Sequence, residues 1–336
     1  MKSWKLAGTG ISSLKLHSDA KDPLPPGHGQ VLVRVRAASL NFRDLLVISG
    51  MYVTCKPDLV PLSDGAGEVI AVGEGVSRFA KGDRVALTFH TDWFGGQYYP
   101  TMNLAGRGGG QTDGMLAEYT CVSQEEVVHL PEHLSYEQGA TLPCAAVTVW
   151  RALTAFTPLS AGNTVLVQGS GGVSIFALQF AKLFGARVIA TSSSEAKLKR
   201  LGELGADELI DYKKTPDWHL RVLELTGGMG VDYTIEVGGK DTFAKTTAAT
   251  RIGGQVNVIG LLSGMPEVGQ DILRRTLSVH GSSVGSREHF EQMNRAIALH
   301  RLQPVVDKVF GFGEAVQAIE HLQAQRHFGK VVIRID

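Results

Sequence analysis

The 336-residue sequence has few cysteines, and their arrangement excludes two common ways of stabilising a fold. Cys55, Cys121 and Cys144 are odd in number and widely spaced, and the chain contains no Cys-x-x-Cys pair. Neither a disulfide framework nor a structural zinc knuckle can be built from such a set. We therefore expect thiols in a reducing compartment, at least two of them as buried apolar side chains.

An excess of charge of either sign is also missing. The 33 Lys and Arg residues balance 33 Asp and Glu residues, and the basic side chains are dispersed along the chain. A basic stripe is the electrostatic signature of proteins that bind nucleic acid or anionic membranes. The sequence therefore predicts no nucleic-acid partner and no membrane partner.

Long apolar runs are lacking too. The most apolar stretch, VSIFALQFAKLFGARVIA, is interrupted by Gln179, Lys182 and Arg187. The N-terminal MKSWKLAG contains no apolar core of signal-peptide length. Because a membrane span needs about 20 predominantly apolar residues, we expect a soluble, cytoplasmic protein.

Glycine, in contrast, is abundant, with 40 residues, and the chain is long for a single hydrophobic core. Up to about residue 128, short alternating runs such as GQVLVRVRAAS and KGDRVALTF are separated by Gly and Asp-Gly turns. This pattern predicts a partly closed antiparallel β-barrel. From residue 131 onward, strands such as TVLVQG and RVIATS alternate with helices, which predicts a doubly wound parallel sheet of the Rossmann type.

The C-terminal segment returns to helices and a strand. The stretches REHFEQMNRAIALHR and EAVQAIEHLQAQR predict two helices, and GKVVIRID predicts a closing strand that rejoins the first domain. We therefore predict an α/β protein in which residues 1–128 and 285–336 form the barrel and substrate domain. Residues 129–284 then form the dinucleotide-binding domain.

The stretch VLVQGSGGVS leads from an apolar strand through a glycine-rich turn into the helical FALQFAKLF. Gly169 permits the sharp turn, and Gly171 removes a side chain so that the backbone can approach a pyrophosphate. The amides of Gly172, Val173 and Ser174 point at the anion from the start of the helix. A lone Gly-x-Gly-x-x-Gly is weak evidence, but the flanking strand, helix and second strand-helix unit favour a nucleotide site over a bare structural turn.

Two departures from the usual fingerprint bear on the choice of nucleotide. Ser174 stands where the last glycine is expected, and its hydroxyl could also donate to a phosphate. The strand VIATSSS ends without the Asp or Glu that accepts from a ribose 2′-hydroxyl, and offers Ser192, Ser193 and then Lys197 instead. Neutral hydroxyls and one cation suit an added 2′-phosphate. The sequence therefore predicts NADPH, with a merely solvated Lys197 as the alternative.

Several motifs together resemble one enzyme family over nearly the whole chain. They are AASLNFRDLLVISGMY, DGAGEVIAVGEGVSRFAKGDRV, DGMLAEY, ATLPCAAVTVWRAL, VLVQGSGGVS and LGADELIDY. These resemble the medium-chain dehydrogenase/reductase superfamily, and within it the zinc-independent quinone oxidoreductase-like branch. The resemblance implies a GroES-like barrel domain for the substrate, a Rossmann domain for the coenzyme, and a C-terminal segment that rejoins the first.

The resemblance also implies contacts with the coenzyme. Thr148 would pack beside the nicotinamide, and Val173 would sit behind its ring. Lys197 and Tyr212 would border the adenosine 2′-phosphate. Leu261 and Lys330 fall where the chain of this family passes the nicotinamide and the phosphates, although Leu261 could be plain core and Lys330 plain surface.

Zinc-dependent alcohol dehydrogenases of this superfamily bind their catalytic metal through a Cys, a His-Glu pair and a second Cys. The matching positions of this chain hold Asn41, Ser63 followed by Asp64, and Cys144. Since a catalytic zinc site needs three good protein ligands, we expect no bound metal. The loop that would carry the four cysteines of a structural zinc site, HTDWFGGQYYPTMNLAGRGGGQTDG, contains none.

Without a Lewis acid, oxidation of an alcohol is disfavoured, whereas hydride delivery to an already electrophilic carbon stays feasible. The expected substrate is a small electrophile, a quinone or an α,β-unsaturated carbonyl, whose developing oxyanion needs hydrogen-bond donors. Asn41 and Tyr52 are the catalytic candidates, and Arg43 is a weaker one. The alternatives are that Asn41 and Asp44 cap the helix FRDLLVIS and that Tyr52 only packs.

The leading functional prediction is thus an NADPH-dependent oxidoreductase of quinones or activated alkenes. An alcohol or aldehyde dehydrogenase and a non-catalytic NADPH-binding protein stay open as alternatives. A homodimer is also expected, because GQVNVIGLLSG and TLSVHGSSVGS have the pattern of apolar strands near a sheet edge, and such strands pair across a two-fold axis in this family.

Overall fold

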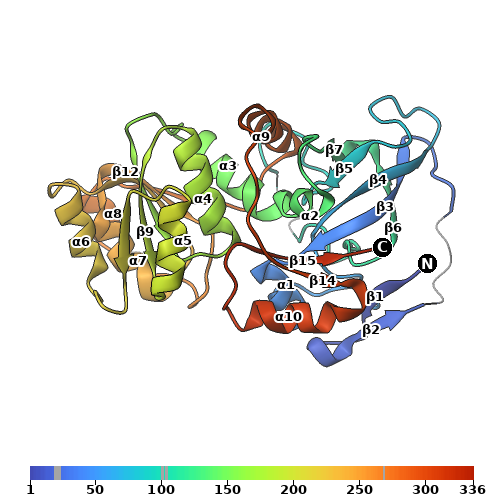
Figure 1. The fold of residues 1–336 in the computed structure, drawn as a ribbon, viewed down its shortest axis with the longest axis horizontal. Helices are drawn as coiled ribbons and strands as arrows, with labels where there is room; N and C mark the ends of the chain where they lie inside the picture. Colours follow the sequence, from blue (N-terminus) through green and yellow to red (C-terminus); the bar gives the residue numbers. More distant parts are fainter. Residues whose placement is uncertain (19–23, 100–101, 103–104, 268) are drawn as a thin grey trace. The chain divides into compact units, whose positions relative to one another are not determined.

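The computed structural model describes residues 1–18, 24–99, 102, 105–267 and 269–336. The chain forms two compact units (Figure 1). The first comprises Met1–Val147 together with Val284–Asp336, and the second comprises Thr148–Ser283. The first boundary therefore lies later than the predicted residue 128, because the short helix α2 (Tyr136–Gly139) and the turn after it belong with the barrel.

The first unit is built mainly of antiparallel strands. Its strands are β1 Ser3–Leu6, β2 Leu14–His17, β3 Gln30–Ser39, β4 Asp64–Val72, β5 Arg84–Leu87, β6 Tyr119–Ser123, β7 Val127–His129, β14 Val306–Gly311 and β15 Lys330–Arg334. The main sheet has the order β14-β15-β3-β4-β5-β7, and β6 also pairs with β3. The mainly antiparallel sheet predicted from the sequence is confirmed, and β15 returns to pair with β3 as expected.

Strand β3 bends because its pairing with β4 shifts register twice, between Leu32 and Val33 and between Val35 and Ala37. Such irregularities increase the local twist, which lets one strand serve two sides of a barrel. The first half of β3 pairs with β6, and its last three residues pair with β15. The end of β3 and the start of β15 are thereby brought together.

The helices of the first unit are α1 Phe42–Ile48, α2 Tyr136–Gly139, α9 Arg287–His300 and α10 Ala315–Gln323. Single helical turns occur at η1 Ile11–Ser13, η2 Gln124–Glu126, η3 Leu142–Ala146 and η4 Phe312–Glu314. Helix α3 (Val147–Thr154) starts with the last residue of this unit's first segment and continues into the second unit.

The second unit contains a six-stranded parallel sheet. Its elements are β8 Thr164–Gln168, α4 Gly172–Leu183, β9 Arg187–Ser192, α5 Glu195–Glu203, β10 Glu208–Asp211, α6 Trp218–Leu225, β11 Val231–Glu236, α7 Lys240–Ala249, β12 Thr250–Val258, α8 Asp271–Arg274 and β13 Ser278–Gly281. The strand order is β10-β9-β8-β11-β12-β13, which confirms the predicted Rossmann sheet.

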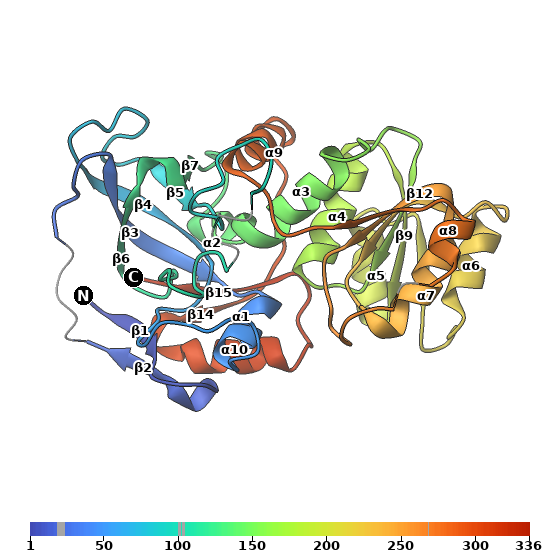
Figure 2. The ribbon, with the colours of Figure 1, turned by 180° about the vertical axis from the view of Figure 1, so that it is seen from behind.

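The strand order explains where the helices lie. The chain moves outward from β8 to β10 and then restarts at β11 on the other side of β8. Because crossover connections are right-handed, the two halves place their helices on opposite faces. Figures 1 and 2 show the sheet nearly edge-on, with α4 and α5 on one side and α6, α7 and α8 on the other. The switch point between β8 and β11 is where this fold binds ligands.

Both units have their own cores. In the first, apolar residues of the strands pack against α10, including Val33 and Val331 with Ile319. In the second, Leu166 and Ile189 pack with Trp218 and other apolar residues. Among the described residues, no helix is both long enough and apolar enough to cross a bilayer.

Candidate functional site

The turn between β8 and α4 has a backbone that suits an anion. Gly169 has a φ of 73°, a left-handed conformation that a side chain would strain. Gly171, the residue before the helix, is extended and carries no side chain to cover the first helical amides. The amides of Gly172 and Val173 belong to the first turn, so they have no intrahelical acceptor and lie at the positive end of the helix dipole. The residues present therefore fit a pyrophosphate.

Ser174 has a different hydrogen-bonding role from the one that its position suggested. Its side chain is buried, and its hydroxyl donates to the carbonyl oxygen of Gln168 at 2.6 Å. The bond closes the turn internally, so this hydroxyl is engaged within the protein. A serine in place of the last glycine thus ties the start of α4 back to the end of β8.

A buried carboxylate that the sequence analysis missed lies beside this turn, at the end of β11. Glu236 is fully buried and accepts hydrogen bonds from the amides of Gly238 and Gly239 at 2.7 and 2.9 Å. It also accepts from Gln168 Nε2 at 3.0 Å, and further hydroxyl donors come from α7. A carboxylate with this many donors is well compensated for its burial. It links the neighbouring ends of β8 and β11 at the switch point.

Leu261 lies just beyond the end of β12 and is 39 % exposed, so it is not a plain core residue. A side chain at Gly239, whose φ is 92°, would come within 3.2 Å of the Leu261 Cα. The Leu261 segment therefore packs against the loop that Glu236 holds. Thr148 and Val173, the other two residues predicted near the nicotinamide, are buried and half-buried respectively.

The residues predicted for the 2′-phosphate lie at the ends of β9 and β10. Ser192 is the last residue of β9, and its carbonyl oxygen accepts from the Tyr212 amide at 3.1 Å, so the two residues are neighbours. Ser193 follows and is half-buried, and Lys197 lies in the first turn of α5. The structure therefore brings Ser192 and Tyr212 together at the carboxyl edge of the sheet.

An acidic residue lies near the carboxyl edge of the sheet, although on β10 instead of β9. Asp211 ends β10 and is in register with Ser192. Its Oδ1 accepts from the backbone amides of Lys213 and Lys214 at 3.0 and 3.3 Å. The carboxylate is thus bound within its own turn. Asp211 comes close to the end of β9 only through the pairing of β9 with β10, which no local sequence pattern indicates.

In the first unit, Asn41 and Lys330 lie together although 289 positions separate them in the sequence. Lys330 is 3 % exposed, and its Nζ donates to Asn41 Oδ1 at 2.5 Å and to the Leu40 carbonyl oxygen at 2.7 Å. The same ammonium lies 3.6 Å from Asp64 Oδ2. Asn41 Nδ2 donates to Ser63 Oγ at 3.4 Å, and Ser63 Oγ donates to Asp64 Oδ1 at 2.8 Å. These contacts close a ring of four side chains, Lys330, Asn41, Ser63 and Asp64, called the polar ring below.

Of the two residues that could cap the helix FRDLLVIS, Asp44 does so with its side chain and Asn41 does not. Asp44 Oδ2 accepts from the Asn41 amide at 2.7 Å, which holds the start of α1. The side chain of Asn41 bonds to Lys330 and Ser63 instead of the helix. Directly before Ser63, the buried Leu62 has a φ of 71°, an unfavourable conformation for a leucine.

Burial perturbs the acids around the polar ring. It raises the pKa of Asp44 to about 6, while the neighbouring Arg43 guanidinium opposes the shift. Burial also raises the pKa of Asp64, and the Lys330 ammonium opposes it. The pKa of the Cys144 thiol is raised by burial and then by the nearby Asp64 carboxylate. Cys144 is therefore a thiol that donates its backbone amide, at 3.3 Å, to Asp64.

Tyr52 lies in the segment after α1 and packs on the core of the first unit. The guanidinium carbon of Arg43 lies 5.0 Å from the centre of its ring. No hydrogen bond to the Tyr52 hydroxyl occurs within the described ranges of the chain. Arg43 itself donates to Asp44 and to the carbonyl oxygens of Ala105 and Arg107, so it holds the glycine-rich loop more than it offers donors to a ligand.

Four positions of this chain match zinc ligands of the zinc-dependent dehydrogenases that it resembles. The groups at these positions are bonded to one another. Asn41, Ser63 and Asp64 belong to the polar ring, and Cys144 is bound to it through its backbone. In the part of the chain that the structure describes, no group of three His, Cys, Asp or Glu side chains is placed to hold a metal ion.

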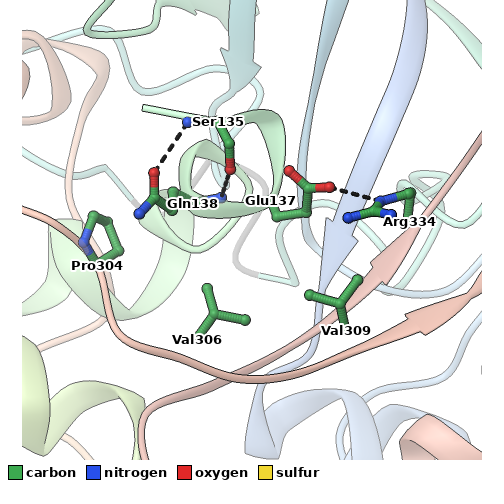
Figure 3. A pocket seen from close by; sticks show the side chains of 7 residues that line it. All are labelled: Ser135, Glu137, Gln138, Pro304, Val306, Val309 and Arg334. Atoms are coloured by element: carbon green, nitrogen blue, oxygen red, sulfur yellow. Dashed lines mark hydrogen bonds and ion pairs between the residues drawn. The ribbon is translucent and has the colours of Figure 1, made fainter. Parts of the chain in front are cut away.

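A separate hollow on the first unit does not coincide with any of these residues. Figure 3 shows Val306 and Val309 beneath an ion pair between Glu137 and Arg334, which measures 2.7 Å. The remaining lining residues are Ser135, Gln138 and Pro304. Ser135 and Gln138 bond to each other, so the polar groups drawn here are engaged in structural contacts.

Comparison with known proteins gives matches over both units. Residues 27–132 match the family model "Alcohol dehydrogenase GroES-like domain", and residues 172–298 match "Zinc-binding dehydrogenase". A zinc-type alcohol dehydrogenase-like protein of Schizosaccharomyces pombe is 42% identical over 92% of this chain and 91% of its own. Human quinone oxidoreductase is 30% identical over 93% of this chain and 91% of its own. A mycobacterial structure in complex with NADPH superposes with a TM-score of 0.84 at 27% identity, covering 100% of both chains.

Proposed function

Because this chain belongs to the medium-chain dehydrogenase/reductase superfamily of oxidoreductases, we propose that it is an NADPH-dependent reductase of quinones or α,β-unsaturated carbonyl compounds that works without a metal. The second unit would bind the dinucleotide, and Asn41 and Tyr52 of the first would donate to the substrate oxygen. Quinone oxidoreductases among its relatives support the substrate class.

The polar ring is the observation that carries this proposal. A catalytic zinc needs nitrogen, sulfur or carboxylate ligands with an open position. Here the matching carboxylate, Asp64, is already compensated by the Ser63 hydroxyl and the Lys330 ammonium, and Asn41 supplies an amide. This donor set suits hydrogen bonding to an oxygen better than metal binding. Substrates that are already electrophilic need only that assistance.

The preference for NADPH is supported by the second unit. The start of α4, which has no side chain at Gly171, suits the pyrophosphate, and Ser192 and Tyr212 lie together at the end of β9, with Ser193 next in the chain and Lys197 in the first turn of α5. The relative solved with NADPH has the same fold. A 2′-phosphate next to a cation and hydroxyl groups is favourable. The end of β9 carries no acid of the kind that an NAD site uses, and the neighbouring Asp211 on β10 is engaged by the amides of its own turn.

Bound NADPH would supply a hydride to the electrophilic carbon of the acceptor. In an enone, the electron pair then moves onto the carbonyl oxygen to give an enolate, which becomes the saturated ketone after it takes up a proton. A quinone becomes a hydroquinone with the same overall uptake of hydride and proton. The role of Asn41 and Tyr52 is to stabilise the negative charge on oxygen by hydrogen bonds, and neither has to supply the proton.

The test is NADPH oxidation with 1,4-benzoquinone, with cyclohexenone and with hexanal, each in protein dialysed against a chelator. We expect turnover with the quinone or the enone that persists after dialysis, and little with the aldehyde. A rate with hexanal that needs added zinc would favour the alcohol or aldehyde dehydrogenase alternative. Tight NADPH binding without turnover of any acceptor would favour the non-catalytic alternative.

A further inference from the structure

The polar ring fixes which end of the Asn41 amide faces the protein. An asparagine has one carbonyl acceptor and two N–H donors, and the two ends are distinguishable only by their partners. An ammonium has donors alone, so the atom 2.5 Å from Lys330 Nζ must be the amide oxygen. The nitrogen then faces Ser63 Oγ at 3.4 Å and also bonds to the Asp64 carboxylate, so a substrate oxygen would take over one N–H from these two partners.

The ammonium also changes the strength of that amide as a donor. A cation on the carbonyl oxygen withdraws electron density from the amide nitrogen and strengthens its N–H bonds as donors, and this effect is largest where water is excluded. Lys330 is 3 % exposed and Asn41 is 9 % exposed. The positive charge is therefore close to the amide and poorly screened.

The same charge could have only a structural purpose, because Asp64 is fully buried and needs compensation. The distances argue for a second purpose. Lys330 Nζ lies 3.6 Å from Asp64 Oδ2, beyond a normal hydrogen bond, but is within 2.5 and 2.7 Å of Asn41 Oδ1 and the Leu40 carbonyl oxygen. The lysine is thus directed at the amide and only shares its charge with the carboxylate.

We propose that Lys330 is a positioning residue that orients and polarises the Asn41 amide, so that Asn41 donates a strengthened hydrogen bond to the substrate oxygen. A buried ammonium then contributes through Asn41 the positive charge that a metal contributes in zinc-dependent relatives. This inference rests on the proposed function for its kinetic consequence, but the orientation of the amide is a property of the protein alone.

The kinetic test compares Lys330→Met with the double variant Lys330→Met/Asp64→Asn. If Lys330 only neutralises Asp64, removing both charges restores activity. If it polarises Asn41, both variants lose 10-fold to 100-fold in kcat with the best acceptor of the wild type, while the dissociation constant for NADPH changes less than about threefold. Lys308→Met, an exposed lysine on β14, is the matched control and should behave as wild type.

The second readout does not depend on turnover. In 15N-labelled protein, the side-chain amide of Asn41 is assigned by its loss in Asn41→Ser, and its two protons are followed in both lysine variants. We expect a shifted, slowly exchanging signal in the wild type that moves toward ordinary asparagine values in both. Wild-type kcat in the double variant, or an Asn41 signal that is unchanged by Lys330→Met, would overturn the inference. A wild type that turns over no acceptor would refute the proposed function, and the amide signal would still decide the role of Lys330.

Discussion

Lys197 is the residue on which the predicted choice of coenzyme depends. It lies in the first turn of α5, where its backbone amide is 3.5 Å from the Ser194 hydroxyl that caps the helix. We expect Lys197→Ala to raise the KM for NADPH about tenfold, which corresponds to about 1.4 kcal/mol, and to leave the KM for NADH unchanged. The measurement is steady-state kinetics with both coenzymes.

Lys199→Ala is the control for this prediction. Lys199 is an exposed cation on the same helix, but side chains two positions apart face different directions. Its loss should affect neither coenzyme. Equal use of NADPH and NADH by the wild type and by Lys197→Ala would show that the lysine is only a solvated surface residue.

Asp44 predicts a dependence of stability on pH. Its pKa is raised from 3.8 to about 6, chiefly by burial, so between these values the folded state holds a proton that the unfolded state has released. The free energy of unfolding therefore falls as pH rises through this window and is constant above it. From pH 5 to 7.5 the loss should be about 1 kcal/mol. Urea unfolding of wild type and Asp44→Asn at both pH values measures it.

The difference between wild type and Asp44→Asn isolates this one group, because the amide cannot titrate. Asp58→Asn, at an exposed carboxylate of the same unit, is the control and should keep the wild-type dependence. If Asp44→Asn showed the same loss of stability between pH 5 and 7.5 as the wild type, the titrating group would have to be another one.

At the scale of single residues, the sequence predicted which residues belong to the site better than it predicted the side chains to which they bond. Asn41 was identified from a motif, and Lys330 was placed near the coenzyme or on the surface. The bond between them could not be foreseen, because it depends on β15 returning to the end of β3 with a specific register. The same holds for Glu236, whose donors come from β8 and α7 and whose role no local pattern encodes.

Among the elements, the turn between β8 and α4 offers a test with a close internal control. Gly169 and Gly162 have φ values of 73° and 85°. An added Cβ would lie 3.9 Å from Ser174 Oγ at Gly169, an ordinary contact, and would meet no atom within 4 Å at Gly162. Alanine at either position should therefore cost a similar backbone strain, about 1–2 kcal/mol. We expect only Gly169→Ala to weaken NADPH binding, by about tenfold or more, because it distorts the first turn of α4.

Thermal unfolding and a fluorescence titration with NADPH separate the two effects. Gly162 lies in the turn before β8, where its amide donates to the Gly185 carbonyl oxygen, so its strain stays away from the start of α4. Should both variants bind NADPH as the wild type does, the glycine turn would have no part in coenzyme binding. Should both lose affinity equally, general destabilisation would be the cause.

Strong periodicity predicted several elements, although KGDRVALTF forms a strand only over Arg84–Leu87, and elements with weak periodicity were missed. The alternating run GQVLVRVRAAS forms β3, and FALQFAKLF lies in α4 except for its last residue, Phe184, which caps the helix. The buried residues Ile175 and Phe176 of α4 pack in the core. Strand β10 and helix α6 were not predicted as such. β10 has four residues, ELID, and takes its conformation from pairing with β9, which is a tertiary contact.

For the whole molecule, the two sheet edges of the second unit are chemically different. β10 ends the sheet at one side and carries Glu208 and Asp211, whose charges oppose pairing with a second copy. β13, Ser278–Gly281, ends it at the other side and has no carboxylate or ammonium side chain. The connection between β12 and β13 exposes large apolar residues, namely Leu261, Leu262, Met265 and Leu273. An edge strand without ionised side chains favours association when exposed apolar residues lie in the segment before it, and the charged groups of that segment include Asp271, Arg274 and Arg275.

We propose that two copies pair through β13 to form a homodimer. A strand that meets its own copy across a two-fold axis runs antiparallel to it, so the two sheets would become continuous and the contact would close after two chains. The prediction is a molar mass of twice the single chain by size-exclusion chromatography with light scattering at micromolar concentration. Leu262→Asp/Leu273→Asp, which places charges at side chains that are 49 % and 83 % exposed, should give the mass of one chain.

Leu209→Asp is the control, since Leu209 is 41 % exposed on β10, at the opposite edge of the sheet. It adds one carboxylate, against two in the double variant, at an exposed leucine of the opposite edge and should leave the dimer intact. Because each copy would keep its own glycine turn and polar ring, the monomeric variant should still bind NADPH, which also shows that it is folded. A wild type with the mass of one chain, or a double aspartate variant that keeps the mass of two, would place the association elsewhere or exclude it.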